Sequence, residues 1–261
     1  MGKFANLIQK ALDFLAPNKK QPTFTSAVIV AGGSSTRMGD GISKQFLEIG
    51  GIPVVARTLL AFEQAPEIDE IIIVVKKEET DLYKSFKDTY NLTKLKKAVV
   101  GGDSRQESAQ NGFLAISQKS QYVAIHDGAR CLITPKEISE VCQAAYTHGA
   151  ATAASRATDT IKIANEGGFI EKTVERNTVW HAQTPQIFKA DLYRAALAVA
   201  ERDGITVTDD CSLVENIEHP IKLVECSASN MKITTPKDIH SAKAIIRARE
   251  NAIKKAGEQK Q

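Results

Sequence analysis

The sequence predicts an α/β protein built on a Rossmann-like, mostly parallel sheet. Three short runs, at residues 27–31, 71–75 and 122–125, are apolar with almost no polar alternation, which is typical of strands buried on both faces. Helical patterns lie between them, at residues 54–62 and 78–90. Because strand and helix alternate along the chain, we expect right-handed βαβ units and a parallel core sheet.

The composition is that of an ordinary globular protein, with 261 residues of which 43% are hydrophobic and 25% charged. The net charge of +3, from 34 basic and 31 acidic residues, is too balanced for a nucleic-acid-binding protein. No apolar run is long enough to span a membrane. The cysteines are scattered without a Cys-x-x-Cys pattern, which favours reduced thiols and a cytoplasmic location. They are Cys131, Cys142, Cys211 and Cys226.

The two ends of the chain differ from its centre. Residues 1–25 combine an amphipathic helical pattern with a polar linker that is bracketed by Pro17 and Pro22. This helix packs on the domain or on a partner subunit, lies on a membrane surface, or serves as a targeting peptide, and the sequence leaves these alternatives open. The main domain is expected at 26–250, followed by a frayed Lys-rich tail at 251–261.

The first informative turn follows the strand at 27–31. Gly32 and Gly33 let backbone N–H groups approach a phosphate, and Arg37 and Lys44 place two cations just behind the turn. The turn is neither a P-loop nor a Gly-x-Gly-x-x-Gly dinucleotide fingerprint. Its pattern, Ala-Gly-Gly-x-x-Thr-Arg-Met-Gly, resembles the signature loop of nucleotidyltransferases that activate sugar or polyol phosphates. A buried strand that ends in an ordinary glycine turn is the alternative interpretation.

A second turn lies at residues 101–108, after a short strand at 97–101. Ser104 and Glu107 have the spacing of a capping box, which predicts that a helix begins at Arg105. Helix-start chemistry explains these two residues without a function. The paired glycines before them, of which Gly102 precedes Asp103, favour close approach of a base or ribose to the backbone.

A third turn follows the strand that begins at Tyr122. Asp127 falls at the strand tip on the same edge of the sheet, where a carboxylate can bind Mg²⁺ that bridges phosphates. Capping of the turn or pairing with Arg130 is the alternative for this residue. His126 is interpreted as a structural histidine, and a second capping box at 134–137 starts the next helix.

Residues 156–180 interrupt the alternation of strand and helix. Strand-like residues 159–164, a turn at 165–168 and a mixed segment at 169–174 predict a β-hairpin arm. An arm with an exposed edge needs a partner, often a second subunit. Arg176 then reaches a phosphate in the neighbour's site, or it is a plain surface arginine.

The last third of the main domain carries one more candidate residue. We expect a short helix at 208–212, a strand at 221–225, and a strand at 230–235 that leads into a capped helix from about residue 236. Lys232 is a lone cation in the last of these strands, and at the ligand edge it would contact phosphate.

These turns in this order resemble the 2-C-methyl-D-erythritol 4-phosphate cytidylyltransferases of the non-mevalonate isoprenoid pathway. The resemblance covers roughly residues 26–247. Its other motifs are the paired glycines with Asp103-Ser104-Arg105, His126-Asp127-Gly128-Ala129-Arg130, Asp159-Thr160, Arg176 with Trp180, Gln183-Thr184-Pro185-Gln186, Thr208-Asp209-Asp210 and Met231-Lys232-Ile233-Thr234. The chain departs from the family at Cys131, where Pro is usual, and at Met231, where Ile is usual.

The resemblance implies a nucleotide-diphospho-sugar transferase type of fold and a reaction in which a phosphate oxygen of methylerythritol phosphate attacks the α-phosphate of CTP. It implies a homodimer joined through the β-hairpin arm and Mg²⁺ held near Asp127. Ribitol-5-phosphate cytidylyltransferase and a catalytically silent regulatory homologue are the rival functions. The implied catalytic residues are Arg37, Lys44, Arg176 and Lys232, and the implied substrate-binding residues are Ala31, Gly32, Gly33, Gly102, Asp103, Ser108, Asp127, Gly128, Arg130 and Thr160.

Overall fold

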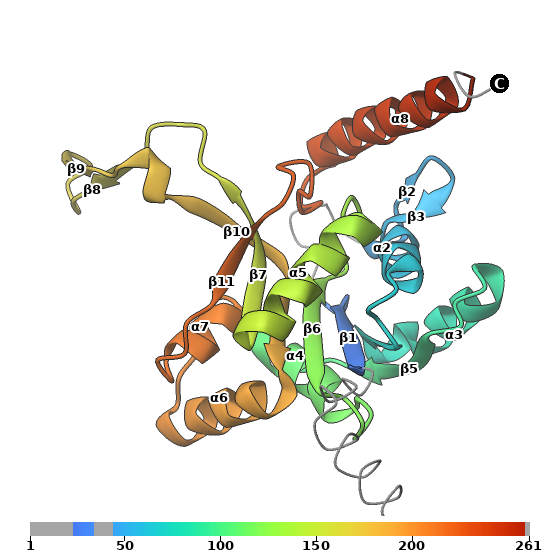
Figure 1. Cartoon of the computed structure of the whole chain (residues 1–261), viewed down its shortest axis with the longest axis horizontal. Coiled ribbons are helices and arrows are strands. Elements are labelled where there is room, and N and C mark those ends of the chain that lie inside the picture. Colours follow the sequence, from blue (N-terminus) through green and yellow to red (C-terminus); the bar gives the residue numbers. More distant parts are fainter. Residues whose placement is uncertain (1–22, 34–43, 259–261) are drawn as a thin grey trace, which may run out of the picture.

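The computed structural model describes residues 23–33 and 44–258, and its centre is a seven-stranded sheet (Figure 1). The strand order is β11-β7-β10-β6-β1-β4-β5. Four neighbours, β6, β1, β4 and β5, run parallel, whereas β10 is antiparallel to both β6 and β7. The strands are β1 (Thr25–Val30), β4 (Glu70–Val75), β5 (Leu95–Val100), β6 (Tyr122–Asp127), β7 (Ala150–Arg156), β10 (Trp180–Lys189) and β11 (Lys222–Glu225).

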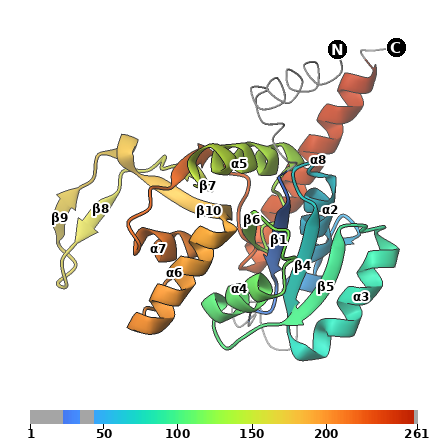
Figure 2. The same cartoon turned by 60° about the horizontal axis from the view of Figure 1, so that its bottom comes forward.

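Helices cover both faces of this sheet (Figure 2). Side chains of β1 alternate between two apolar cores: Ile29 packs with the residues of α2 and α5, and Val28 packs with those of α4 and α6. Every residue of β1 and β4 is buried, as the uninterrupted apolar runs predict. The helices are α2 (Val54–Gln64), α3 (Thr80–Thr89), α4 (Arg105–Leu114), α5 (Pro135–His148), α6 (Ala190–Asp203), α7 (Asp210–Glu215) and α8 (Pro236–Glu258).

Helix α4 approaches the sheet closely because it carries Gly112. A Cβ atom at this position would collide with side-chain methyl groups of Val28 and Val74. The close approach fixes the N-terminus of α4 beside the carboxyl ends of β1 and β5. Turns and short elements complete the described chain: η2 (Lys44–Phe46), β2 (Glu48–Ile49), β3 (Ile52–Pro53), η3 (Lys77–Glu79) and η4 (Arg176–Thr178).

The segment between β7 and β10 projects from the sheet as a hairpin arm (Figure 1). Its strands β8 (Lys162–Ala164) and β9 (Ile170–Thr173) pair antiparallel with each other, and all of their side chains are exposed. At the base of the arm the Arg156 guanidinium lies 4.2 Å from the Trp180 ring centroid and 3.0 Å from Glu225. The base is therefore fixed to the sheet while the tip contacts nothing else in the described chain.

Two expectations for the C-terminal part need correction. Residues 230–235 are not a strand, because Asn230 and Ile233 bond to two different segments: Asn230 Nδ2 donates to Thr184 O on β10, and Ile233 N donates to Ala129 O in the turn after β6. The segment expected to fray from residue 251 is helical as far as Glu258. Among the described helices, none has the length and apolar character to cross a membrane.

Three sequence predictions lie outside the described residues. These are the amphipathic helix at 1–16, the position of Arg37, and the side chain of Lys44. The backbone of Lys44 is described as the first residue of η2.

Candidate active site

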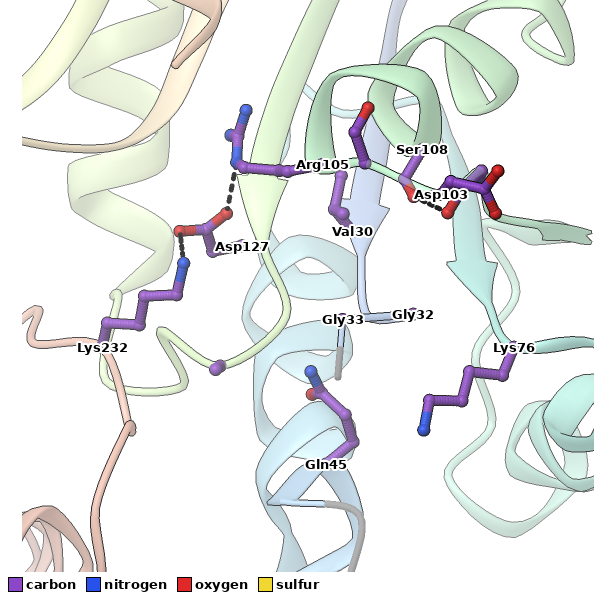
Figure 3. A pocket seen from close by; sticks show the side chains of 13 residues that line it. Val30, Gly32, Gly33, Gln45, Lys76, Asp103, Arg105, Ser108, Asp127 and Lys232 are labelled. Atoms are coloured by element: carbon purple, nitrogen blue, oxygen red, sulfur yellow. Dashed lines mark hydrogen bonds and ion pairs between the residues drawn. The ribbon is translucent and has the colours of Figure 1, made fainter. Parts of the chain in front are cut away.

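The carboxyl ends of the parallel strands enclose a cavity of about 490 Å³ (Figure 3). The glycine turn after β1 forms its floor, the turn after β5 forms one wall, and the tip of β6 forms the opposite wall. Parallel α/β sheets bind ligands at this edge. The cavity brings together seven residues that the sequence predicts: Gly32, Gly33, Gly102, Asp103, Ser108, Asp127 and Lys232.

The turn after β1 lies flat against β4. A Cβ atom added to Gly32 would approach the carbonyl carbon of Val75 to 3.2 Å, whereas one added to Gly33 would meet nothing within 4 Å. Among residues 23–33 and 44–258, nothing would meet a side chain at Gly33, and this glycine lines the cavity. Ala31 is buried and its N–H donates to Val74 O at 2.7 Å, so it anchors the turn without lining the cavity.

The turn after β5 is held by side-chain caps. Ser104 accepts a hydrogen bond from Glu107 N at 3.0 Å, as the capping-box spacing predicts. The Glu107 carboxylate, however, reaches one residue further back and accepts from Asp103 N at 2.8 Å. Ser108 Oγ accepts from Gly102 N at 3.1 Å. A side chain on Gly102 would collide with Glu107, so the turn requires glycine at this position.

Asp127 lies at the centre of a charged cluster (Figure 3). Its Oδ1 is 3.1 Å from Arg105 Nε, and its Oδ2 is 2.8 Å from Lys232 Nζ and 3.7 Å from Arg130 Nε. Burial alone would raise the pKa of this carboxyl, but Arg105, Lys232 and Arg130 together hold it well below its usual range. Asp127 is therefore ionised at neutral pH.

His126 is a structural histidine, as expected. The side chain is fully buried, with its ring 4.8 Å from that of Phe62. Nδ1 lies 3.0 Å from Thr184 Oγ1, which itself accepts from Asp127 N, and Nε2 lies 3.3 Å from Arg130 O. Burial lowers the pKa of His126 to about 3, so the ring is neutral and both of its nitrogens are occupied.

A second cavity of about 270 Å³ lies on the other side of the cluster. It shares Arg105, Asp127 and Lys232 with the first cavity and adds Arg130 together with residues of β10 and the segment before α7. The ion-paired cluster is thus a wall between two polar cavities. This arrangement suits a site in which two substrates meet at one reacting centre.

Several predicted site residues do not line the first cavity. Arg130 lines only the second, and Gly128 lies beneath both, with its N–H donating to Val30 O at 2.8 Å. Thr160 and Arg176 belong to the arm and line neither cavity; Arg176 is exposed and donates to Thr158 O at 3.3 Å. Within one chain these two residues cannot reach the cluster.

Besides the seven predicted residues, the cavity is lined by Val30, Ser104 and Ala129 and by three longer polar side chains that were not predicted for the site: Gln45, Lys76 and Arg105. The position of Lys76 was readable, because it directly follows the apolar strand at 71–75 and so must lie at the ligand edge. Arg105 was seen as the start of a helix, but its pairing with Asp127 depends on how α4 and β6 pack. Gln45 belongs to the Lys44-Gln45 motif of the family resemblance, but it was not predicted as a site residue.

An open, mostly parallel sheet with a glycine turn and a charged cluster at its carboxyl edge defines a nucleotide-binding α/β protein. The model of one family, described as 2-C-methyl-D-erythritol 4-phosphate cytidylyltransferase, matches residues 25–248. The chain belongs to this family and is a nucleotidyltransferase.

Relatives and solved structures agree with this assignment. The cytidylyltransferase of this name from Pelotomaculum thermopropionicum is 39% identical, over 89% of this chain and 98% of the relative. That of Syntrophus aciditrophicus is 41% identical, over 87% of this chain and 97% of its own. The crystal structure of 4-diphosphocytidyl-2C-methyl-D-erythritol synthase from Anaerococcus prevotii superposes with a TM-score of 0.78, at 31% identity, covering 87% of this chain and 100% of that one.

Proposed function

We propose that this enzyme transfers the cytidylyl group of CTP to 2-C-methyl-D-erythritol 4-phosphate and releases pyrophosphate. The relatives that have this name align with the chain over nearly their whole length. The observation that carries the proposal is the wall of Asp127, Lys232 and Arg105 between two polar cavities. One cavity has the glycine turns that a nucleotide needs, and the other has a partly buried arginine, Arg130, for a phosphate.

The nucleotide is assigned to the larger cavity. Its cytidine lies against Gly102, Asp103 and Ser108, where the capped turn offers backbone groups at fixed positions. Its phosphates cross Gly33 toward Lys232, both of which line this cavity. The acceptor phosphate enters from the smaller cavity beside Arg130, whose Nη1 is anchored on Asn230 O at 2.9 Å.

The reaction needs positioning and charge neutralisation rather than a general base. A phosphate monoester oxygen is already anionic, so it attacks the α-phosphorus directly, and the bond from that phosphorus to the bridging oxygen of pyrophosphate breaks. Lys232 borders both cavities and is placed to stabilise the negative charge of the transition state. By resemblance to the family, Arg37 and Lys44 act on the same charge. His126, neutral and fully hydrogen-bonded, takes no part in proton transfer.

Mg²⁺ fits this site with Asp127 as its protein ligand. The carboxylate lines the nucleotide cavity, and Mg²⁺ in nucleotide enzymes is held by one or two carboxylates together with phosphate oxygens and water. No group of three or more His, Cys, Asp or Glu side chains in residues 23–33 and 44–258 could hold a metal by itself. When bound, the ion neutralises triphosphate charge, while Lys232 and Arg105 compensate the carboxylate in its absence.

The complete site is assigned to a homodimer. Thr160 and Arg176 are exposed on an arm that projects from the sheet, and the arm carries exposed apolar residues, Phe169 at 74% and Ile170 at 66%. Large exposed apolar side chains on a hairpin are typical of an interface between subunits. Seated on a second copy of the chain, the arm delivers Arg176 to the acceptor phosphate of that copy.

A cytoplasmic location is consistent with the four cysteines, all of which are free and buried. Burial raises the pKa of Cys131 to about 11 and that of Cys142 to about 12, so these thiols stay protonated and inert.

Pyrophosphate release from CTP and Mg²⁺ tests the proposal, with methylerythritol phosphate and ribitol 5-phosphate compared as acceptors. Turnover with methylerythritol phosphate alone is expected. Turnover with ribitol phosphate alone would support the cytidylyl transfer reaction but would show that methylerythritol phosphate is not the acceptor. CTP binding without turnover with either acceptor would favour the silent regulatory homologue.

A further inference from the structure

A chain of contacts leads from the interior of the protein to the charged cluster. Tyr193 Oη on α6 donates to Asp210 Oδ1 at 2.6 Å. Arg105 Nη1 donates to Asp210 Oδ2 at 2.7 Å, and Arg105 Nε donates to Asp127 Oδ1 at 3.1 Å. The contacts connect α6 and α7 with α4 and β6, and the Arg105–Asp210 contact joins residues that are 105 positions apart in the sequence. Neither Tyr193 nor Asp210 lines either cavity.

The buried end of this series of contacts, formed by Tyr193 and Asp210, is held in place by its surroundings. Tyr193 is fully buried, with its ring stacked on Phe188 at 5.3 Å and edge-on to Phe113 at 5.0 Å. Asp210 is 1% exposed and is the first residue of α7, which Asp209 caps through Ser212 N at 3.1 Å. A buried carboxylate with two fixed partners is a rigid anchor.

The guanidinium of Arg105 donates hydrogen bonds to two carboxylates, those of Asp127 and Asp210. Asp210 accepts a hydrogen bond from Nη1 and Asp127 accepts one from Nε. Nη2 is buried with no hydrogen-bond partner in the described chain. Arg105 therefore contacts Asp127 through Nε alone and engages only Oδ1. Oδ2 is left for Lys232 at 2.8 Å. A lysine lacks the planar fork that holds Nε and Nη1 at fixed positions, so it does not reproduce this pair of contacts.

We propose that Tyr193 and Asp210 are positioning residues for the transfer reaction: they fix Arg105 and thereby set the Asp127 carboxylate between the two cavities. This inference rests on the proposed function. Its consequence is that a hydroxyl remote from both substrates controls the rate of the chemical step. A purely structural role would alter only the stability of the fold.

The test uses three conservative variants of the full-length enzyme: Tyr193→Phe, Asp210→Asn and Arg105→Lys. We measure kcat, KM for CTP and thermal unfolding for each. Tyr193→Phe keeps the ring packing and is expected to lower kcat about fivefold with little change in KM; Asp210→Asn and Arg105→Lys are expected to lower it about a hundredfold. The double variant Tyr193→Phe/Arg105→Lys is expected to match Arg105→Lys alone, because both changes act through one contact.

Tyr83→Phe is the matched control. Tyr83 is also fully buried in an aromatic cluster, but its hydroxyl has no hydrogen-bond partner in the described chain and lies outside the contacts described above. It is expected to keep the wild-type kcat. Wild-type kcat in Tyr193→Phe, or a double variant whose effects multiply, would overturn the inference. A wild-type enzyme without pyrophosphate release would instead overturn the proposed function.

Discussion

At the scale of single residues, the site depends on how charges are paired before any substrate arrives. Asp127 is compensated by Arg105, Lys232 and Arg130, of which Arg105 and Lys232 border both cavities. The sequence predicted Asp127, Arg130 and Lys232 at this edge because each follows a recognisable turn or apolar run. It offered the pairing of Asp127 with Arg130 as an alternative, and this pair is present at 3.7 Å. It could not predict the pairing of Asp127 with Arg105, which depends on the packing of α4 on the sheet through Gly112.

His126 makes the stability of the protein depend on pH. Its pKa is about 3 in the folded chain and near 6.5 when unfolded, so between these values only the unfolded state is protonated. The contribution of His126 to the free energy of unfolding is complete above pH 6.5 and falls as the pH drops toward 3. From pH 7 to pH 5 this group is expected to remove about 2 kcal/mol from the free energy of unfolding.

Denaturant unfolding of the wild type and of His126→Gln, each at pH 7 and pH 5, checks this expectation. The glutamine variant does not titrate and should lose correspondingly less stability over the same interval. Equal losses in the two proteins would contradict a neutral buried ring.

Lys76 is expected to contribute to nucleotide binding. It lies between the glycine turn after β1 and the turn after β5, and it forms no ion pair within residues 23–33 and 44–258. Lys76→Met should raise KM for CTP about fivefold and leave kcat almost unchanged, because the charge is separated from the reacting phosphorus. The neighbouring exposed Lys77→Met carries the same charge change outside the cavity and should have no effect. A fall in kcat alone would show that Lys76 acts on the transition state.

At the scale of elements, the start of α5 connects the fold to the site. Thr134 and Glu137 form the capping box that the sequence predicts, and Pro135 stands at the first helical position. Glu137 does more than the pattern indicates, since its Oε1 also accepts from Ser227 N at 2.9 Å. The carboxylate thereby holds the loop that leads to Lys232.

Glu137→Ala is therefore expected to lower both stability and turnover. Loss of the cap and of the loop contact should cost about 2 kcal/mol of unfolding free energy, and kcat should fall as Lys232 loses its fixed position. Glu140→Ala removes an exposed carboxylate from the same helix, 3.7 Å from Lys136, and should change stability by less than about 0.5 kcal/mol. Unchanged kcat in Glu137→Ala would show that Glu137 caps the helix without positioning Lys232 in the active site.

The elements that the sequence predicts well are those with a local signal. Uninterrupted apolar runs identified β1, β4 and β6, and capping patterns placed the starts of α4 and α5. The segment at 230–235 alternates like a strand but is held by Asn230, whose amide bonds to Gln183 and Thr184 from β10. Such long-range hydrogen bonds leave no mark on local periodicity, and this explains why the predicted strand was wrong.

At the scale of the whole molecule, the arm is expected to decide both assembly and activity. Ile170→Asp places a charge on the exposed apolar surface of β9 and should convert a dimer into a monomer in analytical ultracentrifugation. Activity should disappear in parallel, because Arg176 and Thr160 then reach no partner. Leu114→Asp changes an equally exposed side chain at the end of α4 and should leave both properties intact. A fully active monomer would refute the shared site.

The projecting arm has a genetic consequence. Arg176 and Lys232 belong to one chain, yet in the proposed dimer they serve different sites. A chain that lacks Arg176 and a chain that lacks Lys232 are each inactive, but a mixed pair contains one complete site. Random pairing of equal amounts restores about a quarter of the wild-type activity. Two loss-of-function alleles of this gene would therefore complement each other when one damages the arm and the other damages the sheet.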